Sequence, residues 1–220
     1  MDRFWSVALL GALAGVVLPW VWARTVEGMR VVGSCPAIRG PWRPLTVCGS
    51  AVGLAAGSIV VAWRVHDRNG GVLLVAAWLA VLYVGLLLAA VDVATRRLPS
   101  PILAAAAMAV GVCLVGHAGV TGQWCTLATA LLASGVLGGG HLLLALVGGG
   151  AVGMGDVRMA AVLGASLGAL GWTAVMWGAV LPYVLAVPEA VVRLASPRRP
   201  DLAFGPYLLV GALLAVTLGP

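Results

Sequence analysis

Long apolar runs separated by short polar breaks dominate the chain. The breaks contain Arg, Pro and Gly, and most of the runs approach the length of about 20 residues that a membrane-spanning helix requires. The pattern predicts spans at 5–23, 46–63, 72–92, 100–118, 124–147, 156–168, 170–192 and 204–219. The sixth run is short and the break after it is weak, so seven spans is the rival count. The sequence therefore predicts an all-α, polytopic transmembrane bundle.

Composition agrees with a membrane protein. Hydrophobic residues make up 62% of the 220 positions and charged residues only 9%, whereas a soluble domain carries about 25% charged residues. Such a chain could not cover its own surface in water, so lipid is expected to surround much of it. No Ala-x-Ala cleavage site follows the first run, which we interpret as a retained span. No soluble domain is evident, so we expect a single membrane-embedded domain over residues 1–220.

The net charge of +6 comes from thirteen arginines that lie mostly in the breaks between apolar runs. Membrane topology explains this placement better than nucleic-acid binding, so we expect no nucleic-acid partner. With eight spans and the N-terminus outside, ten arginines face the cytoplasm and three face out; with seven spans the division is seven against six. The charge bias favours eight spans. The 24–45 loop then lies in the cytoplasm, where its arginines can contact anionic lipid headgroups.

Seven acidic residues occur in the chain, and five of them have simple explanations as terminal, loop or ion-paired charges: Asp2, Glu27, Asp67, Glu189 and Asp201. Glu189 precedes Arg193 by four residues, which favours an ion pair along one helix face. The remaining two acids are Asp92 and Asp156, and they are the candidate functional pair.

Asp92 ends an apolar run that extends from Gly71 through Val91, and a carboxylate there is costly unless it faces a polar cavity or a partner. Asp156 follows Gly-Met-Gly and opens the sixth apolar run. The span map places both acids at the cytoplasmic face. Two structural explanations compete with a functional one: Asp156 as a helix N-cap, and Asp92 as the ion-pair partner of Arg96.

Two carboxyl groups on one membrane face can hydrolyse a peptide bond. The ionised group acts as general base on a water molecule, the protonated group polarises the scissile carbonyl, and the sequence alone cannot assign the two roles. Glycines before the second acid, Gly153 and Gly155, would let an extended substrate backbone approach closely, so we interpret them as substrate-binding.

Other chemistry is less well supported. The four cysteines form no Cys-x-x-Cys pair, so no zinc site is expected, and no cofactor is implied. The histidines lie far apart in the sequence, and His141 is expected to form a hydrogen bond between helices rather than to assist catalysis. Glycine stripes in the first two runs predict close helix packing. They are Gly11 and Gly15 in the first run and Gly49, Gly53 and Gly57 in the second. The glycine cluster at 138–140 is expected to loosen the end of the fifth span.

Three motifs resemble those of the type IV prepilin peptidases. The segment from Asp92 to Pro99 is similar to that family's first aspartate motif, in which an Asp is followed by a Leu-Pro or Ile-Pro step. The segment from Gly153 to Met159 is similar to the second motif, Gly-x-Gly-Asp with a basic residue two positions later. Phe204 to Tyr207 resembles the Phe-Gly-Pro element that opens the family's last helix, and 11–27 loosely resembles its first helix.

The resemblance implies an aspartic endopeptidase with Asp92 and Asp156 as its catalytic pair. It implies cleavage of the basic leader from type IV prepilins or pseudopilins, whose apolar N-terminal helix stays in the bilayer of the bacterial cytoplasmic membrane. The 24–45 loop contains only Cys35, so the cysteine-rich insert and methyltransferase activity of larger members are not expected. Ser100 and Arg158 also depart from the family, which often has an acid or Asn and a Lys there. The alternative is a non-proteolytic, transporter-like or pilus-assembly protein with the same fold.

Overall fold

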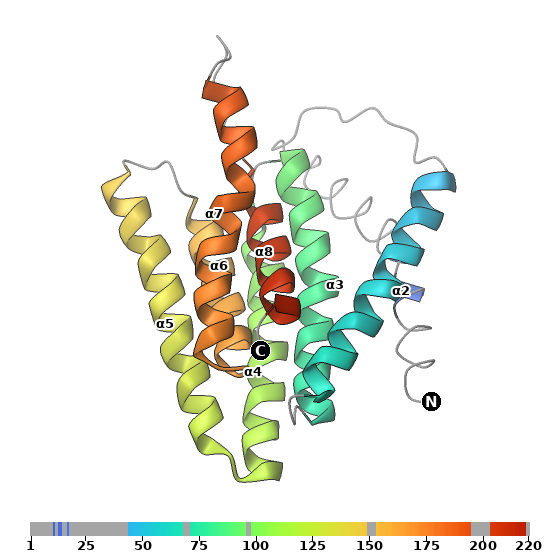
Figure 1. Ribbon diagram of the computed structural model, residues 1–220, viewed down its shortest axis with the longest axis vertical. Coiled ribbons are helices and arrows are strands. Elements are labelled where there is room, and N and C mark those ends of the chain that lie inside the picture. The colour runs from blue at the N-terminus through green and yellow to red at the C-terminus, as the bar shows by residue number, and fades with distance from the viewer. Residues whose placement is uncertain are drawn as a thin grey trace.

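The computed structural model describes residues 11, 13, 14, 17, 44–67, 71–95, 98–148, 153–194 and 203–218. In these ranges the regular elements are all α-helices, and residues 11, 13, 14 and 17 are also helical. Seven helices follow in order: α2 (Pro44–Asp67), α3 (Val72–Thr95), α4 (Ser100–Thr121), α5 (Trp124–Val147), α6 (Met154–Gly168), α7 (Trp172–Leu194) and α8 (Gly205–Leu218). Figure 1 shows them side by side as one bundle.

Among the described residues, four helices are long and apolar enough to cross a membrane: α3, α4, α5 and α7. Shorter apolar segments are Leu54–His66, which is part of α2, and α8, Gly205–Leu218. The prediction of an all-α membrane bundle is therefore confirmed in this coarser form. The seven helices lie where the second to eighth apolar runs predicted them, whereas most of the first run, 5–23, lies outside the described residues.

The weak break after the sixth run is a true helix boundary. Helix α6 ends at Gly168 and α7 begins at Trp172. Between them Gly171 has a φ of 113°, a left-handed conformation that side chains other than glycine disfavour. The short connection turns the chain back, so α6 and α7 are antiparallel neighbours (Figure 1). This removes the reason for merging the two runs into one span.

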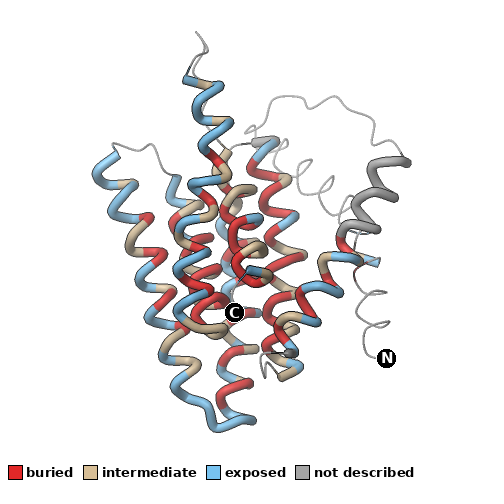
Figure 2. The backbone as a smooth tube through the Cα atoms, viewed as in Figure 1, coloured by how far each residue is buried: buried red, intermediate tan, exposed pale blue. Residues whose placement is uncertain are grey.

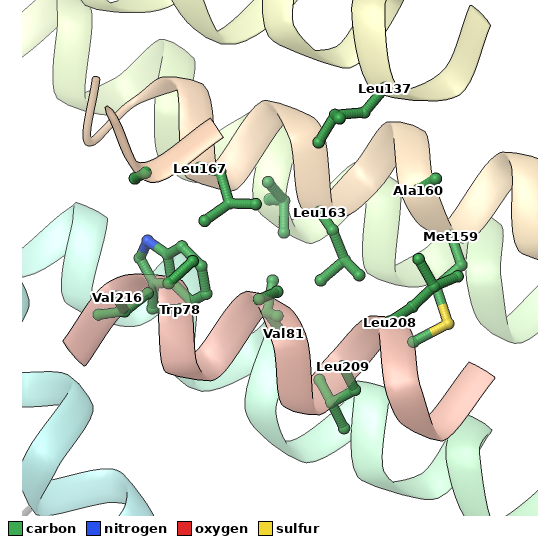
Figure 3. Packing of buried hydrophobic residues seen from close by; sticks show 14 of the residues in the cluster. Trp78, Val81, Leu137, Met159, Ala160, Leu163, Leu167, Leu208, Leu209 and Val216 are labelled. Carbon is green, nitrogen blue, oxygen red and sulfur yellow. The ribbon is translucent and has the colours of Figure 1, made fainter. Parts of the chain in front are cut away.

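The core of the bundle lies where α3, α6 and α8 meet (Figures 1 and 3). Trp78 of α3, Leu167 of α6 and Leu209 of α8 are among its largest fully buried side chains. More than half of the apolar stretch of α3 is buried inside the bundle, whereas only 22% of the apolar stretch of α7 is buried. Helix α3 is therefore central and α7 peripheral. The outer faces of α5 and α7 are exposed and largely apolar (Figure 2), as expected for surfaces in contact with lipid.

Glycines bring α5 and α6 close together. A Cβ added at Gly164 or Gly168 would lie 2.7 Å from a backbone oxygen of α5, and one at Gly138 would lie 2.8 Å from the Cβ of Ala161. Small residues at such contacts allow backbones to pack tightly. The expectation that glycines 138–140 loosen α5 is wrong, because the helix continues through them to Val147 and Gly138 is used for packing.

Glycine also joins the first run to α2. A Cβ at Gly11 would lie 2.6 Å from the Ser58 Oγ and 2.8 Å from the Cα of Ala55, so this glycine packs directly against α2. The close helix approach predicted from the first glycine stripe is confirmed at this position.

Candidate active site

Asp92 lies in the last turn of α3 and is buried, with 6% of its surface exposed. Its Oδ2 accepts a hydrogen bond of 3.1 Å from the backbone N–H of Gly205. Gly205 is the first residue of α8, where backbone N–H groups have no partner within the helix and the helix dipole favours a negative charge. The end of α3 and the start of α8 therefore meet through this carboxylate.

The Phe-Gly-Pro element gains a structural role from this contact. A Cβ at Gly205 would lie only 2.8 Å from the Asp92 Oδ2, so only glycine lets α8 begin this close to the carboxylate. Pro206 follows within the first turn of α8, where its missing N–H leaves no helical hydrogen bond unmade. The prediction that this element opens the last helix is confirmed, whereas its direct contact with Asp92 was not foreseen.

Asp156 is the third residue of α6 and is half-buried. The N-cap of this helix is Gly153, so the interpretation of Asp156 as the N-cap is wrong by three positions. Its carboxyl group instead receives a hydrogen bond from the backbone of Gly153. This is the reach-back contact that an acidic residue makes from the third helical position to the N-cap. A local turn therefore orients Asp156.

The two aspartates line the same polar pocket of about 360 Å³. The two residues are 64 positions apart in the chain, and their carboxyl groups are close enough to interact electrostatically. The other lining residues lie in or directly after the two motif segments: Leu98, Ser100, Gly153, Met154, Gly155 and Arg158. The pairing of Asp92 with Arg96 lies outside the described residues.

Gly155 connects the two motifs inside the pocket wall. A Cβ at this position would lie 2.7 Å from the Cβ of Leu98 and 2.9 Å from its Cδ1. The Leu-Pro step of the first motif thus packs directly on the Gly-x-Gly-Asp segment of the second. Both Gly153 and Gly155 line the pocket, but the absence of a side chain at Gly155 is already required by Leu98. Substrate binding by these glycines stays a prediction.

A side-chain hydrogen bond adds a second link between the motifs. The Arg158 guanidinium donates to the Ser100 Oγ at 2.7 Å. Both positions are among those at which the chain departs from the prepilin peptidase motifs, and they contact each other. Ser100 begins α4 directly after Leu98 and Pro99, and Arg158 lies in the second turn of α6.

An aromatic cluster lies beside the contact between Asp92 and Gly205. Its members are His141, Tyr183, Phe204 and Tyr207. The Tyr183 and Phe204 ring centroids are 5.2 Å apart, and His141 stacks on Tyr183 at 5.8 Å. His141 Nδ1 contacts the Leu137 carbonyl oxygen at 2.8 Å, and its Nε2 is 3.1 Å from the Tyr183 hydroxyl. His141 is therefore an interhelical hydrogen bonder between α5 and α7, as predicted.

Sequence reasoning missed Tyr183, and it named Tyr207 only as part of the Phe-Gly-Pro segment without predicting its contact. The Tyr183 hydroxyl lies within electrostatic range of Asp156, and the Tyr207 hydroxyl donates a hydrogen bond to Glu189. The predicted ion pair between Glu189 and Arg193 is confirmed, so Glu189 joins α7 to α8 through Tyr207. A usable signal existed, because the chain has only three tyrosines and one of them directly follows Phe-Gly-Pro.

Two carboxyl groups in one pocket can share a proton and act as general base and general acid toward a bound amide. Among the residues that the structure describes, no group of three His, Cys, Asp or Glu side chains could hold a metal ion. Cys113 and Cys125 are free thiols, and the other two cysteines lie outside the described side chains.

No protein-family model matches this chain, and no curated protein or solved structure matches it either.

Proposed function

We propose that this chain is a membrane aspartic endopeptidase that uses Asp92 and Asp156 as its catalytic pair. The observation that carries the proposal is the shared pocket, in which the only two acids without a simple structural explanation in the sequence approach each other from α3 and α6. A buried carboxylate at the end of an apolar helix is costly, and a second acid in the same pocket adds to that cost, so a functional requirement explains the pair better than packing does.

The proposed reaction is hydrolysis of one peptide bond. One carboxylate removes a proton from a water molecule, and the water oxygen attacks the carbonyl carbon of the scissile bond. The other carboxyl group donates its proton to the carbonyl oxygen, giving a neutral tetrahedral intermediate. When the C–N bond breaks, the amine nitrogen takes the proton held by the first carboxylate, and the second recovers its own. The pocket then again holds one proton between two acids.

The resemblance to prepilin peptidases supplies the substrate class. We propose that the enzyme removes the basic leader of type IV prepilins or pseudopilins at the cytoplasmic face of the bacterial membrane, with Gly153 and Gly155 beside the extended substrate backbone. We also propose that the chain crosses the membrane eight times, with its N-terminus outside. In support, Arg158 and Arg193 belong to the helix ends on the side of the aspartates, whereas Arg64 contacts the Thr217 carbonyl at the opposite end (Figure 1).

The test is co-expression with a reporter that carries a basic leader, a glycine and an apolar helix of about 20 residues. We expect Asp92→Asn and Asp156→Asn each to abolish leader removal at normal protein levels. Asp67→Asn, at the far end of α2, is the matched control and should cleave normally. Unchanged cleavage in either of the first two variants would contradict the two-aspartate mechanism and favour a non-proteolytic protein with this fold.

A further inference from the structure

A second pocket, of about 600 Å³, lies between α4, α5 and α6. Its lining is almost entirely apolar and follows one face of α4 from Ser100 to Val115. At a rise of 1.5 Å per residue this face is about 22 Å long, or roughly four helical turns. The pocket is therefore an elongated groove rather than a compact cavity. In Figure 1, α4 and α5 meet at the turn that joins them and diverge toward the end of the bundle that holds Asp92 and Asp156.

The groove is continuous with the candidate active site. Ser100 and Arg158 line both pockets, and their hydrogen bond of 2.7 Å lies where the two pockets meet. From this shared wall the polar pocket extends to the aspartates and the apolar groove extends away along α4 and α5. A single polypeptide could thus place a polar, extended segment beside the carboxyls and an apolar segment in the groove.

We propose that the groove binds the apolar transmembrane helix of the substrate, on the side of the scissile bond that stays in the bilayer. This inference rests on the proposed function, since it names the surface that would hold the substrate during cleavage. Ala104, Ala107 and Gly111 line the groove at helical spacing, and small residues let a second helix approach closely in lipid.

The dimensions favour one face of a helix as the occupant. A helix with its side chains is about 10 Å wide, so a groove of about 600 Å³ over roughly 20 Å of length takes the side chains of one face only. The opposite face of the substrate helix would stay in contact with lipid. Such a site would let a substrate enter sideways from the bilayer without opening the bundle.

Gly111 offers a position from which an added side chain would enter the groove. A Cβ added there meets no atom within 4 Å, and the same holds for Gly119, which lies two turns further along α4 and does not line the groove. We expect Gly111→Phe to lower cleavage of the co-expressed single-span reporter at least tenfold and Gly119→Phe to leave it within twofold. Equal cleavage by the two variants, at equal protein levels, would overturn the proposal.

A crosslinking experiment separates the groove from the chemistry. A benzophenone amino acid replaces either Val115, which lines the groove and is 51% exposed, or Val112, a valine of α4 that does not line it and is 66% exposed. Both are made in the uncleaving Asp156→Asn background with the reporter present. We expect a reporter adduct from position 115 and none from position 112. Adducts from both positions, from neither, or to phospholipid alone at position 115 would overturn the groove as a substrate site.

The two proposals fail in different ways. If the aspartate variants abolish cleavage while Gly111→Phe cleaves normally, the groove proposal fails and the peptidase stands. If an aspartate variant still cleaves while Gly111→Phe is impaired and position 115 crosslinks the reporter, the two-aspartate mechanism fails and the groove stands.

Discussion

The two aspartates of the candidate site are oriented by different kinds of structure. Asp92 is buried and takes its backbone hydrogen bond from Gly205, a residue 113 positions away on another helix. Asp156 is half-buried and takes its backbone hydrogen bond from Gly153, three residues earlier in its own turn. The first depends on how α3 packs against α8, whereas the second depends on a local loop-to-helix geometry.

The glycines beside the two carboxyls show the same difference. An added Cβ at Gly205 would press on the Asp92 carboxylate at 2.8 Å, while one at Gly153 would be 3.5 Å from the Asp156 Oδ2, an ordinary van der Waals distance. Gly153 also has a φ of −70°, which any residue adopts. A tertiary anchor should therefore be less tolerant of substitution than a local one.

Among substitutions that leave both aspartates in place, the largest effect is expected for Gly205→Ala. The new methyl group would force α8 away from the carboxylate and weaken a hydrogen bond to a charged group, a loss of about 1.5–3 kcal/mol. Because each 1.36 kcal/mol is a factor of ten in rate, leader cleavage should fall by roughly 10- to 100-fold. The measurement is the rate of reporter cleavage in membranes that contain matched amounts of enzyme.

Gly153→Ala is the matched change on the Asp156 side. We expect cleavage to stay within about threefold of the unsubstituted protein, because the methyl group meets only a van der Waals contact and the backbone is already in a common conformation. A loss as large as that of Gly205→Ala would show that the turn before Asp156 is as constrained as the α3 to α8 contact. The distinction between tertiary and local anchoring would then be wrong.

Gly155→Ala should reduce stability by disturbing the packing between the two motifs. Its Cβ would come within 2.7 Å of the Leu98 Cβ, which is fixed to the backbone and cannot rotate away. Overpacking of this kind costs about 1–3 kcal/mol. The measurement is the thermal unfolding midpoint in detergent, with Gly140→Ala as control, since a Cβ there meets nothing within 4 Å. Equal midpoints for the two variants would mean that Leu98 does not pack on Gly155.

The sequence predicted the positions of the helices well because each is a nearly unbroken apolar run. Lipid imposes one requirement on every span, internal satisfaction of backbone hydrogen bonds, so the run itself marks the helix. The error at glycines 138–140 has a clear cause. Glycine lowers helix propensity in water, but in a bundle it also allows close approach, and the contact between Gly138 and Ala161 outweighs the propensity.

The sequence singled out Asp92 and Asp156 because charge is rare in this chain, but it could not find what positions them. The hydrogen bond from Gly205, the contact of Leu98 with Gly155 and the proximity of Tyr183 to Asp156 all depend on long-range packing. No periodicity along the chain carries that information. The Phe-Gly-Pro element shows the limit clearly: its residues are recognisable in the sequence, but its role appears only when α8 meets α3.

A moderate effect is expected for the link between Arg158 and Ser100. Ser100→Ala removes an acceptor from an exposed hydrogen bond worth about 0.5–1.5 kcal/mol, so cleavage should fall by roughly two- to tenfold. Arg158→Lys keeps the charge but not the planar donor geometry, so its cleavage should fall by a similar factor. The double variant should be no worse than the more impaired single variant, because both remove one contact. Additive losses would show that Arg158 acts on the site independently of Ser100.

The smallest effect is expected for Tyr183→Phe, which tests whether the aromatic cluster supports Asp156 through structure alone. The change removes the hydroxyl that contacts the His141 Nε2 at 3.1 Å but keeps the tilted ring contact with Phe204. Hydrogen bonds between membrane helices contribute about 0.6 kcal/mol on average, so the unfolding midpoint should fall by a few degrees at most. His141→Ala should cost more, since it also removes a buried ring. If Tyr183→Phe instead lowers cleavage more than tenfold while the midpoint is unchanged, the hydroxyl acts on Asp156 directly. The Asp156 side of the pocket would then depend on a long-range partner as the Asp92 side does.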